Sequence, residues 1–346
     1  MRSGCSTSSP DRACAWNPVR PASSAGVGRL LLCACLLFAA AVADADWYTR
    51  SASKMGTRIE LRLWHEDPAT AERLLEAGLA EVDRIEAEMS TYRDSSALSR
   101  VNREAASGPV KVSAELYGLL QRSLELSRLS GGAFDISYDS VGQLYDFRKR
   151  RHPDAAEIAA RLPAIDYRAI ELLPDHQVAF ARPGLRVNLG GIAKGYTVET
   201  IVARWREAGV RHALATAGGD TRLLGDKRGK PWIVGIRDPD DEQGLVTRLA
   251  LVDEAISTSG DYERFFDDGG LRYHHILDPA SGDSARSLRS ASVIGPDATM
   301  TDGLSTAVFV LGPDRGLALI DSLPDYEAVL VLPDHSVRVS RGLAGS

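Results

Sequence analysis

Apolar and polar residues alternate along the stretch MGTRIELRLWHED, residues 55–67. This period of two predicts a half-buried strand. Asp67 and Pro68 then supply a helix cap and a first-turn proline. The apolar residues that follow at helical spacing are Leu74, Leu75, Leu79, Val82 and Ile85. The pattern therefore predicts a strand that leads directly into an amphipathic helix.

Two more helices and several short strands are predicted further along the chain. One helix runs from about 113 to 130 and ends at a pair of glycines, and the other runs from about 192 to 208 and ends at Gly209. The segments with strand patterns are HALATAGG, PWIVGI, TRLALV, AISTS, YHHIL, SASVIG and EAVLVL. This irregular alternation predicts an α+β fold with mixed sheets and packed helices. No long linker or repeat interrupts it, so we expect one domain over residues 46–346.

The first 45 residues differ from the rest of the chain. Arginines precede an uninterrupted apolar run, LLLCACLLFAAAVA at 30–43, and the small residues of AVADADW follow it. This order is typical of a signal peptide. We expect residues 1–45 to be removed by cleavage near 43–46 and the protein to be exported to the periplasm. A retained anchor in the inner membrane and a lipid anchor at Cys35 are the open alternatives.

Composition excludes several classes of protein. The chain has 346 residues and a net charge of -6, and its basic residues are interspersed with acids. Because no basic stripe is visible, nucleic acid is not an expected partner. All four cysteines lie in the segment that we expect to be removed. The mature chain is therefore expected to use neither disulfides nor a catalytic thiol.

A glycine-rich turn, NLGGIAKGY at 188–196, stands where an extended segment gives way to a helix. It matches neither the Walker pattern nor G-x-G-x-x-G. Gly190 and Gly191 allow close backbone approach, the helix start would present free N–H groups, and Lys194 adds a cation. A diphosphate would suit this turn, and the alternative is a structural corner with a solvated lysine.

Two other patterns contain side chains that are suited to catalysis. Asp302 and Thr306 are four residues apart in TMTDGLSTAVFVLG, and this spacing puts two hard oxygen donors on one helix face. The alternative is that Asp302 only caps the helix. His274 and His275 are adjacent on an alternating segment, so one faces inward, where it is a candidate general base or a structural histidine.

Taken together and in order, these segments resemble the FAD:protein FMN transferases of the ApbE family and their flavin-binding relatives. The resemblance covers roughly residues 50–335. The motifs that carry it are MGT (55–57), MSTYRDSSALSRVN (89–102), GGAFDIS (131–137), LGGIAKGY (189–196), AGGD (217–220), PWIVGIRDP (231–239), STSGDYERFF (257–266), YHHILDP (273–279) and TDGLSTAVFVLG (301–312).

The resemblance implies an activity and a set of site residues. Such an enzyme transfers the FMN part of FAD to a Thr or Ser hydroxyl of an acceptor protein and releases AMP, and it depends on Mg²⁺. The glycine turn would hold the FAD diphosphate, and Gly191, Asp302 and Thr306 would bind Mg²⁺. His275 would deprotonate the acceptor, which would be a flavoprotein subunit of a membrane or periplasmic redox complex. The residues that would line the flavin nucleotide are Met55, Tyr92, Ala133, Phe134, Asp135, Asn188, Lys194 and Leu277.

Departures from the family pattern leave alternatives open. Asn188 stands where many members carry aspartate, Ser305 replaces an acid that some members have near the metal, and the segment at 137–148 differs from the expected continuation. An exported protein that binds or hydrolyses FAD, and a noncatalytic accessory factor of a redox complex, are the competing interpretations.

Overall fold

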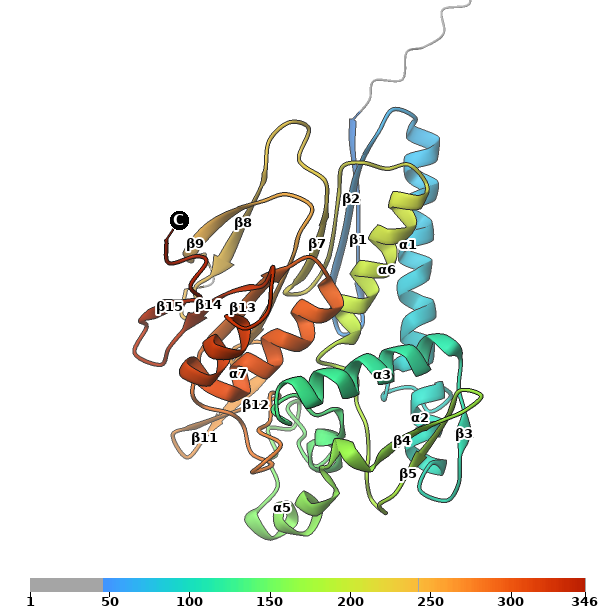
Figure 1. The fold of residues 1–346 in the computed structure, drawn as a ribbon, viewed down its shortest axis with the longest axis vertical. Helices are drawn as coiled ribbons and strands as arrows, with labels where there is room; N and C mark the ends of the chain where they lie inside the picture. Colours follow the sequence, from blue (N-terminus) through green and yellow to red (C-terminus); the bar gives the residue numbers. More distant parts are fainter. Residues whose placement is uncertain (1–45, 242, 346) are drawn as a thin grey trace, which may run out of the picture. The chain divides into compact units, whose positions relative to one another are not determined.

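The computed structural model describes residues 46–345 except residue 242, and these belong to one compact unit (Figure 1). The expected signal peptide, residues 1–45, lies outside the described residues, so its cleavage and the export that it implies remain predictions.

An eight-stranded sheet forms the centre of the fold. Its strands, in spatial order, are β1 (Asp46–Lys54), β2 (Thr57–His65), β6 (Ala213–Ala217), β7 (Asp220–Leu224), β10 (Ala255–Gly260), β13 (Ser290–Gly295), β14 (Glu327–Val331) and β15 (Val337–Val339). Within the α+β class, which is confirmed, every pairing between described strands is antiparallel rather than mixed. Short turns join β1 to β2 and β6 to β7, and such hairpins require antiparallel pairing.

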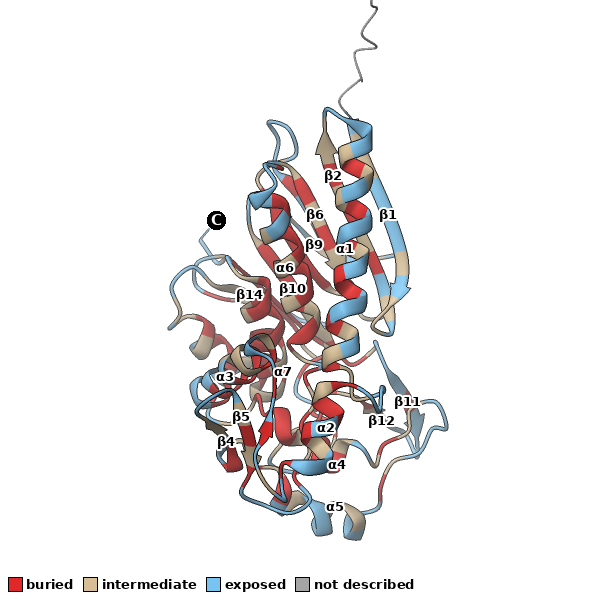
Figure 2. Ribbon diagram, turned by 90° about the vertical axis from the view of Figure 1, so that its right-hand side faces the viewer, coloured by how far each residue is buried: buried red, intermediate tan, exposed pale blue. Residues whose placement is uncertain are grey.

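Three long helices, α1 (Pro68–Met89), α6 (Ala193–Glu207) and α7 (Ala298–Ile320), pack on this sheet. Figure 2 shows α1 with buried residues along one side and exposed residues along the other. The side chains of Leu61, Leu75 and Trp205 meet in the core between sheet and helices. The helix α7 is apolar enough to cross a membrane by length and composition, yet it packs against α6, β10 and β13 in the core.

The remaining elements surround one end of these helices (Figure 1). They are α2 (Ala97–Glu104), β3 (Val110–Lys111), α3 (Ala114–Leu129), η1 (Ile136–Tyr138), α4 (Asp139–Gly142), α5 (Ala155–Arg161), η2 (Leu162–Ala164), η3 (Tyr167–Ala169), β4 (Ile170–Leu173) and β5 (Gln177–Phe180). Two hairpins complete the fold, β8 (Trp232–Arg237) with β9 (Leu245–Leu251) and β11 (Phe265–Asp268) with β12 (Leu271–His274).

The predicted helices are confirmed, and so is the cap at Asp67 that the sequence indicated. Asp67 accepts a hydrogen bond from the Thr70 N–H at the start of α1, and Ser113 caps α3 in the same way. The predicted strand YHHIL is only partly confirmed, because β12 ends at His274 and His275 follows it. The pairing of β12 with β11 stops at Phe265, so the chain is free to turn into the interior there.

Candidate functional site

One pocket of about 1000 Å³ gathers side chains from most of the described chain. Met55 comes from the turn between β1 and β2, Tyr92 follows α1, Lys194 begins α6, and Thr306 lies on α7. Every residue that the resemblance assigned to the nucleotide, the metal or the base lines this pocket. Their positions are thus brought together, while their chemical roles remain predictions.

His274 is buried in the core and makes three contacts there. Its Nε2 donates to the Ala285 carbonyl oxygen at 2.6 Å, and the Ile276 N–H donates to its Nδ1 at 3.3 Å. A carbonyl only accepts and an amide N–H only donates, so these partners fix the neutral form with the proton on Nε2. The ring also meets Phe309 edge-on, with 5.5 Å between the ring centres. An inward-facing histidine was expected to be either a general base or a structural residue, and His274 fits the structural role.

His275 lines the pocket and is held by its backbone. Its N–H donates to the Arg264 carbonyl oxygen at 3.2 Å, and its buried Nδ1 has no hydrogen-bond partner among the described residues. Burial, followed by the effects of His274, Arg264 and Lys194, lowers the pKa of His275 to about 3. The imidazole is therefore neutral at physiological pH, which is the form that can accept a proton.

Two backbone N–H groups at the start of α6 already have hydrogen-bond acceptors within the protein, whereas the sequence suggested free N–H groups there. The Ala193 N–H donates to the Leu189 carbonyl oxygen at 2.8 Å. The Gly195 N–H donates to Oδ2 of Asp302 at 2.8 Å. The expectation of a row of free N–H groups is wrong at these two positions, because a carboxylate from α7 and a preceding carbonyl already use them.

Lys194 is not the free cation that the turn suggested. Its Nζ lies 2.5 Å from Oδ2 of Asp220 and 3.5 Å from Oδ1 of Asp302. Both carboxylates are almost fully buried, with side-chain exposures of 2% and 3%. The solvated-lysine alternative is also wrong, because this ammonium lies between two buried acids. Its positive charge is already compensated before any ligand binds.

Oxygen donors converge beside this ion pair. Asp302 lies in the second turn of α7, whose cap is Asp297, so the view of Asp302 as a cap of its own helix is wrong. Oγ1 of Thr306 lies 3.2 Å from Oγ of Ser259. A β-carbon at Gly191 would come within 3.2 Å of Thr306 Oγ1, so the Gly191 backbone passes close to that hydroxyl.

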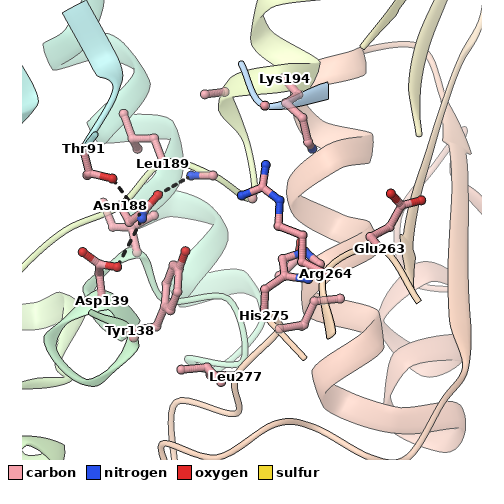
Figure 3. Close-up of a pocket in the computed structure, with 18 of the residues that line it drawn as sticks. Thr91, Tyr138, Asp139, Asn188, Leu189, Lys194, Glu263, Arg264, His275 and Leu277 are labelled. Carbon is pink, nitrogen blue, oxygen red and sulfur yellow. Dashed lines mark hydrogen bonds between the residues drawn. The ribbon is translucent and has the colours of Figure 1, made fainter. Parts of the chain in front are cut away.

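Asn188 organises another wall of the pocket (Figure 3). Its Nδ2 donates to Oγ1 of Thr91 at 3.3 Å and to Oδ1 of Asp139 at 3.2 Å, and its Oδ1 accepts the Gly190 N–H at 2.8 Å. Asp139 also pairs with Arg186 at 2.5 Å. Asn188 therefore joins three segments of the chain, and an aspartate at this position could not donate to Asp139.

Two other predicted flavin residues differ in their freedom to bind a ligand. The Asp135 carboxylate is engaged within the protein, because it accepts hydrogen bonds from Ser137 and from the Tyr167 N–H. Tyr92 is 85% exposed at the pocket and has its ring available to another planar group. Asp135 thus shapes the wall, whereas Tyr92 is free to contact a ligand.

Three pocket residues were not singled out from the sequence. Asp220 and Arg264 lie within the motifs AGGD and STSGDYERFF, which signalled the family but not these roles. Tyr138 belongs to the segment that departs from the family pattern, and it lies in the pocket near Gly190.

The chain matches the ApbE family over residues 55–330, and it belongs to that family. A protein from Treponema pallidum (strain Nichols) named FAD:protein FMN transferase is 35% identical over 319 residues, which cover 86% of this chain and 87% of the relative. A protein of the same name from Klebsiella pneumoniae (strain 342) is 32% identical over 86% of this chain and 93% of the relative.

Solved structures show the same fold. The crystal structure of the ApbE protein from Thermotoga maritima aligns with a TM-score of 0.79 at 29% identity and covers 86% of this chain and 98% of that one. The flavin transferase ApbE from Vibrio cholerae aligns with a TM-score of 0.79 at 28% identity and covers 87% of this chain and 99% of that one.

Proposed function

We propose that this chain is an FAD:protein FMN transferase, which moves the FMN part of FAD onto a Thr or Ser hydroxyl of an acceptor protein. The observation that carries the proposal is the pocket in which neutral His275 lies near the Lys194 ion pair and buried oxygen donors. The relatives that share this fold and most of this chain carry the same name.

The proposed reaction is a single phosphoryl transfer. The acceptor hydroxyl oxygen attacks the phosphorus on the FMN side of FAD, a P–O bond forms, and the bond to the AMP phosphate breaks so that AMP leaves. His275 takes the hydroxyl proton, because it is the neutral imidazole in the pocket and its Nδ1 lacks a partner among the described residues. The low pKa of His275 describes the pocket without its ligand, and the negative diphosphate would raise it toward a useful range.

We include Mg²⁺ in the proposal because the donor set fits it. Asp302, Thr306 and the Gly191 carbonyl would hold the ion, and hard oxygen ligands of this kind are those that Mg²⁺ prefers. Two buried carboxylates, Asp220 and Asp302, share one ammonium, and burial together with the charge of Asp220 raises the pKa of Asp302 to about 7, so a bound cation would favour its ionised form. Among the described residues no group of three or more His, Cys, Asp or Glu could hold a metal, so the proposed ligands include a hydroxyl and a backbone carbonyl beside one carboxylate. When bound, Mg²⁺ would stabilise negative charge on the diphosphate.

The proposal extends to location and partner. The composition of residues 1–45 supports export to the periplasm. An acceptor would then be a flavoprotein subunit of a periplasmic or membrane redox complex. Cell fractionation with N-terminal sequencing of the recovered protein tests this part, and an intact N-terminus in the cytoplasm would contradict it.

Mass spectrometry tests the activity. The purified full chain is incubated with FAD, Mg²⁺ and a candidate acceptor, and the acceptor is expected to gain one FMN phosphoester at a Thr or Ser while AMP appears in equal amount. Release of FMN and AMP with no labelled acceptor would instead indicate FAD hydrolysis. The matched control is the same mixture with His275→Ala.

A further inference from the structure

The pocket must supply positive charge to hold a diphosphate, and Lys194 does not supply it alone. Its ammonium is shared by Asp220 at 2.5 Å and Asp302 at 3.5 Å, so its positive charge is already paired within the protein. A diphosphate placed here would meet two carboxylates, and repulsion between like charges costs affinity. Another cation of the protein is therefore needed beside any metal.

Arg264 is such a cation. It follows β10, it is exposed within the pocket, and its guanidinium has neither a hydrogen bond nor an ion pair in the part of the chain that the structure describes. In Figure 3 its side chain rises from beside His275 toward Lys194. The neighbouring Glu263 points away from it, and that carboxylate lies 3.8 Å from Arg237 instead.

The backbone at Arg264 is paired with that of His275, and Gly56 leaves room for the guanidinium. The Arg264 carbonyl oxygen accepts the His275 N–H at 3.2 Å, so the backbones that carry the cation and the candidate base lie side by side. A β-carbon at Gly56 would lie 2.6 Å from Arg264 Nη2. Gly56 has a φ of +70°, so glycine suits both the turn and the space that the guanidinium occupies.

We infer that Arg264 is the anion-binding residue of this pocket and that it binds the diphosphate of FAD across from Lys194. The inference rests on the proposed function, because it takes FAD as the ligand. A guanidinium presents parallel N–H donors that match two phosphate oxygens, whereas an ammonium acts as a point charge. Arg264 would therefore select ligands that carry a phosphate and orient them beside His275.

Equilibrium binding to the full chain at fixed Mg²⁺ tests the inference with three ligands. FAD and ADP carry the diphosphate, and riboflavin carries the flavin without phosphate. In Arg264→Gln we expect the dissociation constants of FAD and ADP to rise by about 10- to 100-fold, the range for a lost hydrogen bond to a charged group. Riboflavin binding should change less than about twofold, and Arg264→Lys should fall between Arg264→Gln and the wild type.

Arg315→Gln is the matched control, because it removes the same charge from an exposed arginine outside this pocket. Equal losses for FAD and riboflavin in Arg264→Gln would overturn the inference, since they would indicate a distorted pocket. Unchanged FAD and ADP affinity would also overturn it, even if transfer slowed. A wild type that binds FAD through Arg264 but labels no acceptor would contradict the proposed function and leave this inference standing.

Discussion

At the scale of single residues, two adjacent histidines show how environment separates identical side chains. His274 has both ring nitrogens engaged and lies in the core, while His275 has a free Nδ1 in the pocket. The sequence predicted that adjacent residues would face different ways. It could not predict that His274 would be the one held in the core, because Ser284 and Ala285, which bind it, lie outside the strand pattern.

We expect His275→Ala to lose FMN transfer by about two to four orders of magnitude, the usual contribution of a positioned base. FAD binding should survive, because the His275 side chain makes no hydrogen bond that holds the pocket together. His274→Ala should instead keep most of its transfer rate while its free energy of unfolding falls by about 1–3 kcal/mol, since it leaves buried partners unpaired. Transfer rates, FAD affinities and urea unfolding, measured for both variants, test these two expectations. The base assignment is wrong if His274→Ala is the inactive variant.

His274 also predicts how stability depends on pH. Burial, which outweighs the bond to Ala285, lowers the pKa of His274 to about 4 from an ordinary value of 6.5. Between pH 6.5 and pH 4 the unfolded chain binds more protons at this histidine than the folded chain does. The contribution of neutral His274 to the free energy of unfolding is therefore complete above pH 6.5 and is lost as the pH falls toward 4. The loss amounts to about 3 kcal/mol at most.

Urea unfolding at several pH values checks this prediction on the wild type and on His274→Gln. The difference in unfolding free energy between them should shrink on acidification, because only the wild type loses this contribution. His335→Gln, at a histidine that is 64% exposed, is the control. A difference that stays constant from about pH 7 to about pH 4.5 would contradict the prediction.

At the scale of secondary-structure elements, local patterns predicted the helices well and their contacts poorly. The start of α1 and both ends of α3 and α6 fall within a residue or two of the predicted ones, because caps, prolines and glycines act over a few residues. The third glycine of LGGIAKGY, Gly195, was given no role from the sequence, and the structure shows a packing one. A β-carbon at Gly195 would lie 2.1 Å from the Ala298 carbonyl oxygen, so this glycine lets α6 and α7 touch.

Gly195→Ala should therefore be strongly destabilising. The added methyl group would meet the α7 backbone, which cannot move aside as a flexible side chain would, and such overpacking costs about 1–3 kcal/mol or more. Gly118→Ala is the matched control, because Gly118 lies inside α3 with no atom near its would-be β-carbon. The free energy of unfolding of Gly118→Ala should rise by about 0.5–1 kcal/mol. Thermal unfolding of the two variants measures the contrast, and equal melting temperatures would show that the α6–α7 contact relaxes at no cost.

At the scale of the whole molecule, the pocket is lined by residues as distant in sequence as Met55 and Thr306. The resemblance to the family predicted which residues line the pocket, because the ordered motifs contain those residues. The charge balance could not be predicted, because Lys194 looks free in its own motif and meets Asp220 only when β7 and α6 pack together. Pairwise contacts between distant segments leave no periodic signal in a single sequence.

The two carboxylates that share Lys194 make the stability of the protein depend on Mg²⁺. Burial and the charge of Asp220 raise the pKa of Asp302 to about 7, so a metal bound at Asp302 would stabilise its ionised form. A ligand that binds only the folded state stabilises the whole molecule. The melting temperature of the wild type should therefore rise by a few degrees in Mg²⁺ relative to EDTA. In Asp302→Asn that rise should vanish and transfer should be lost, while the melting temperature in EDTA should not fall below that of the wild type, because the buried carboxyl group that is costly to ionise is gone. Asp314→Asn, which changes an exposed carboxylate on the same helix, should behave as the wild type does. A rise with Mg²⁺ in Asp302→Asn equal to that of the wild type would show that the ion binds elsewhere.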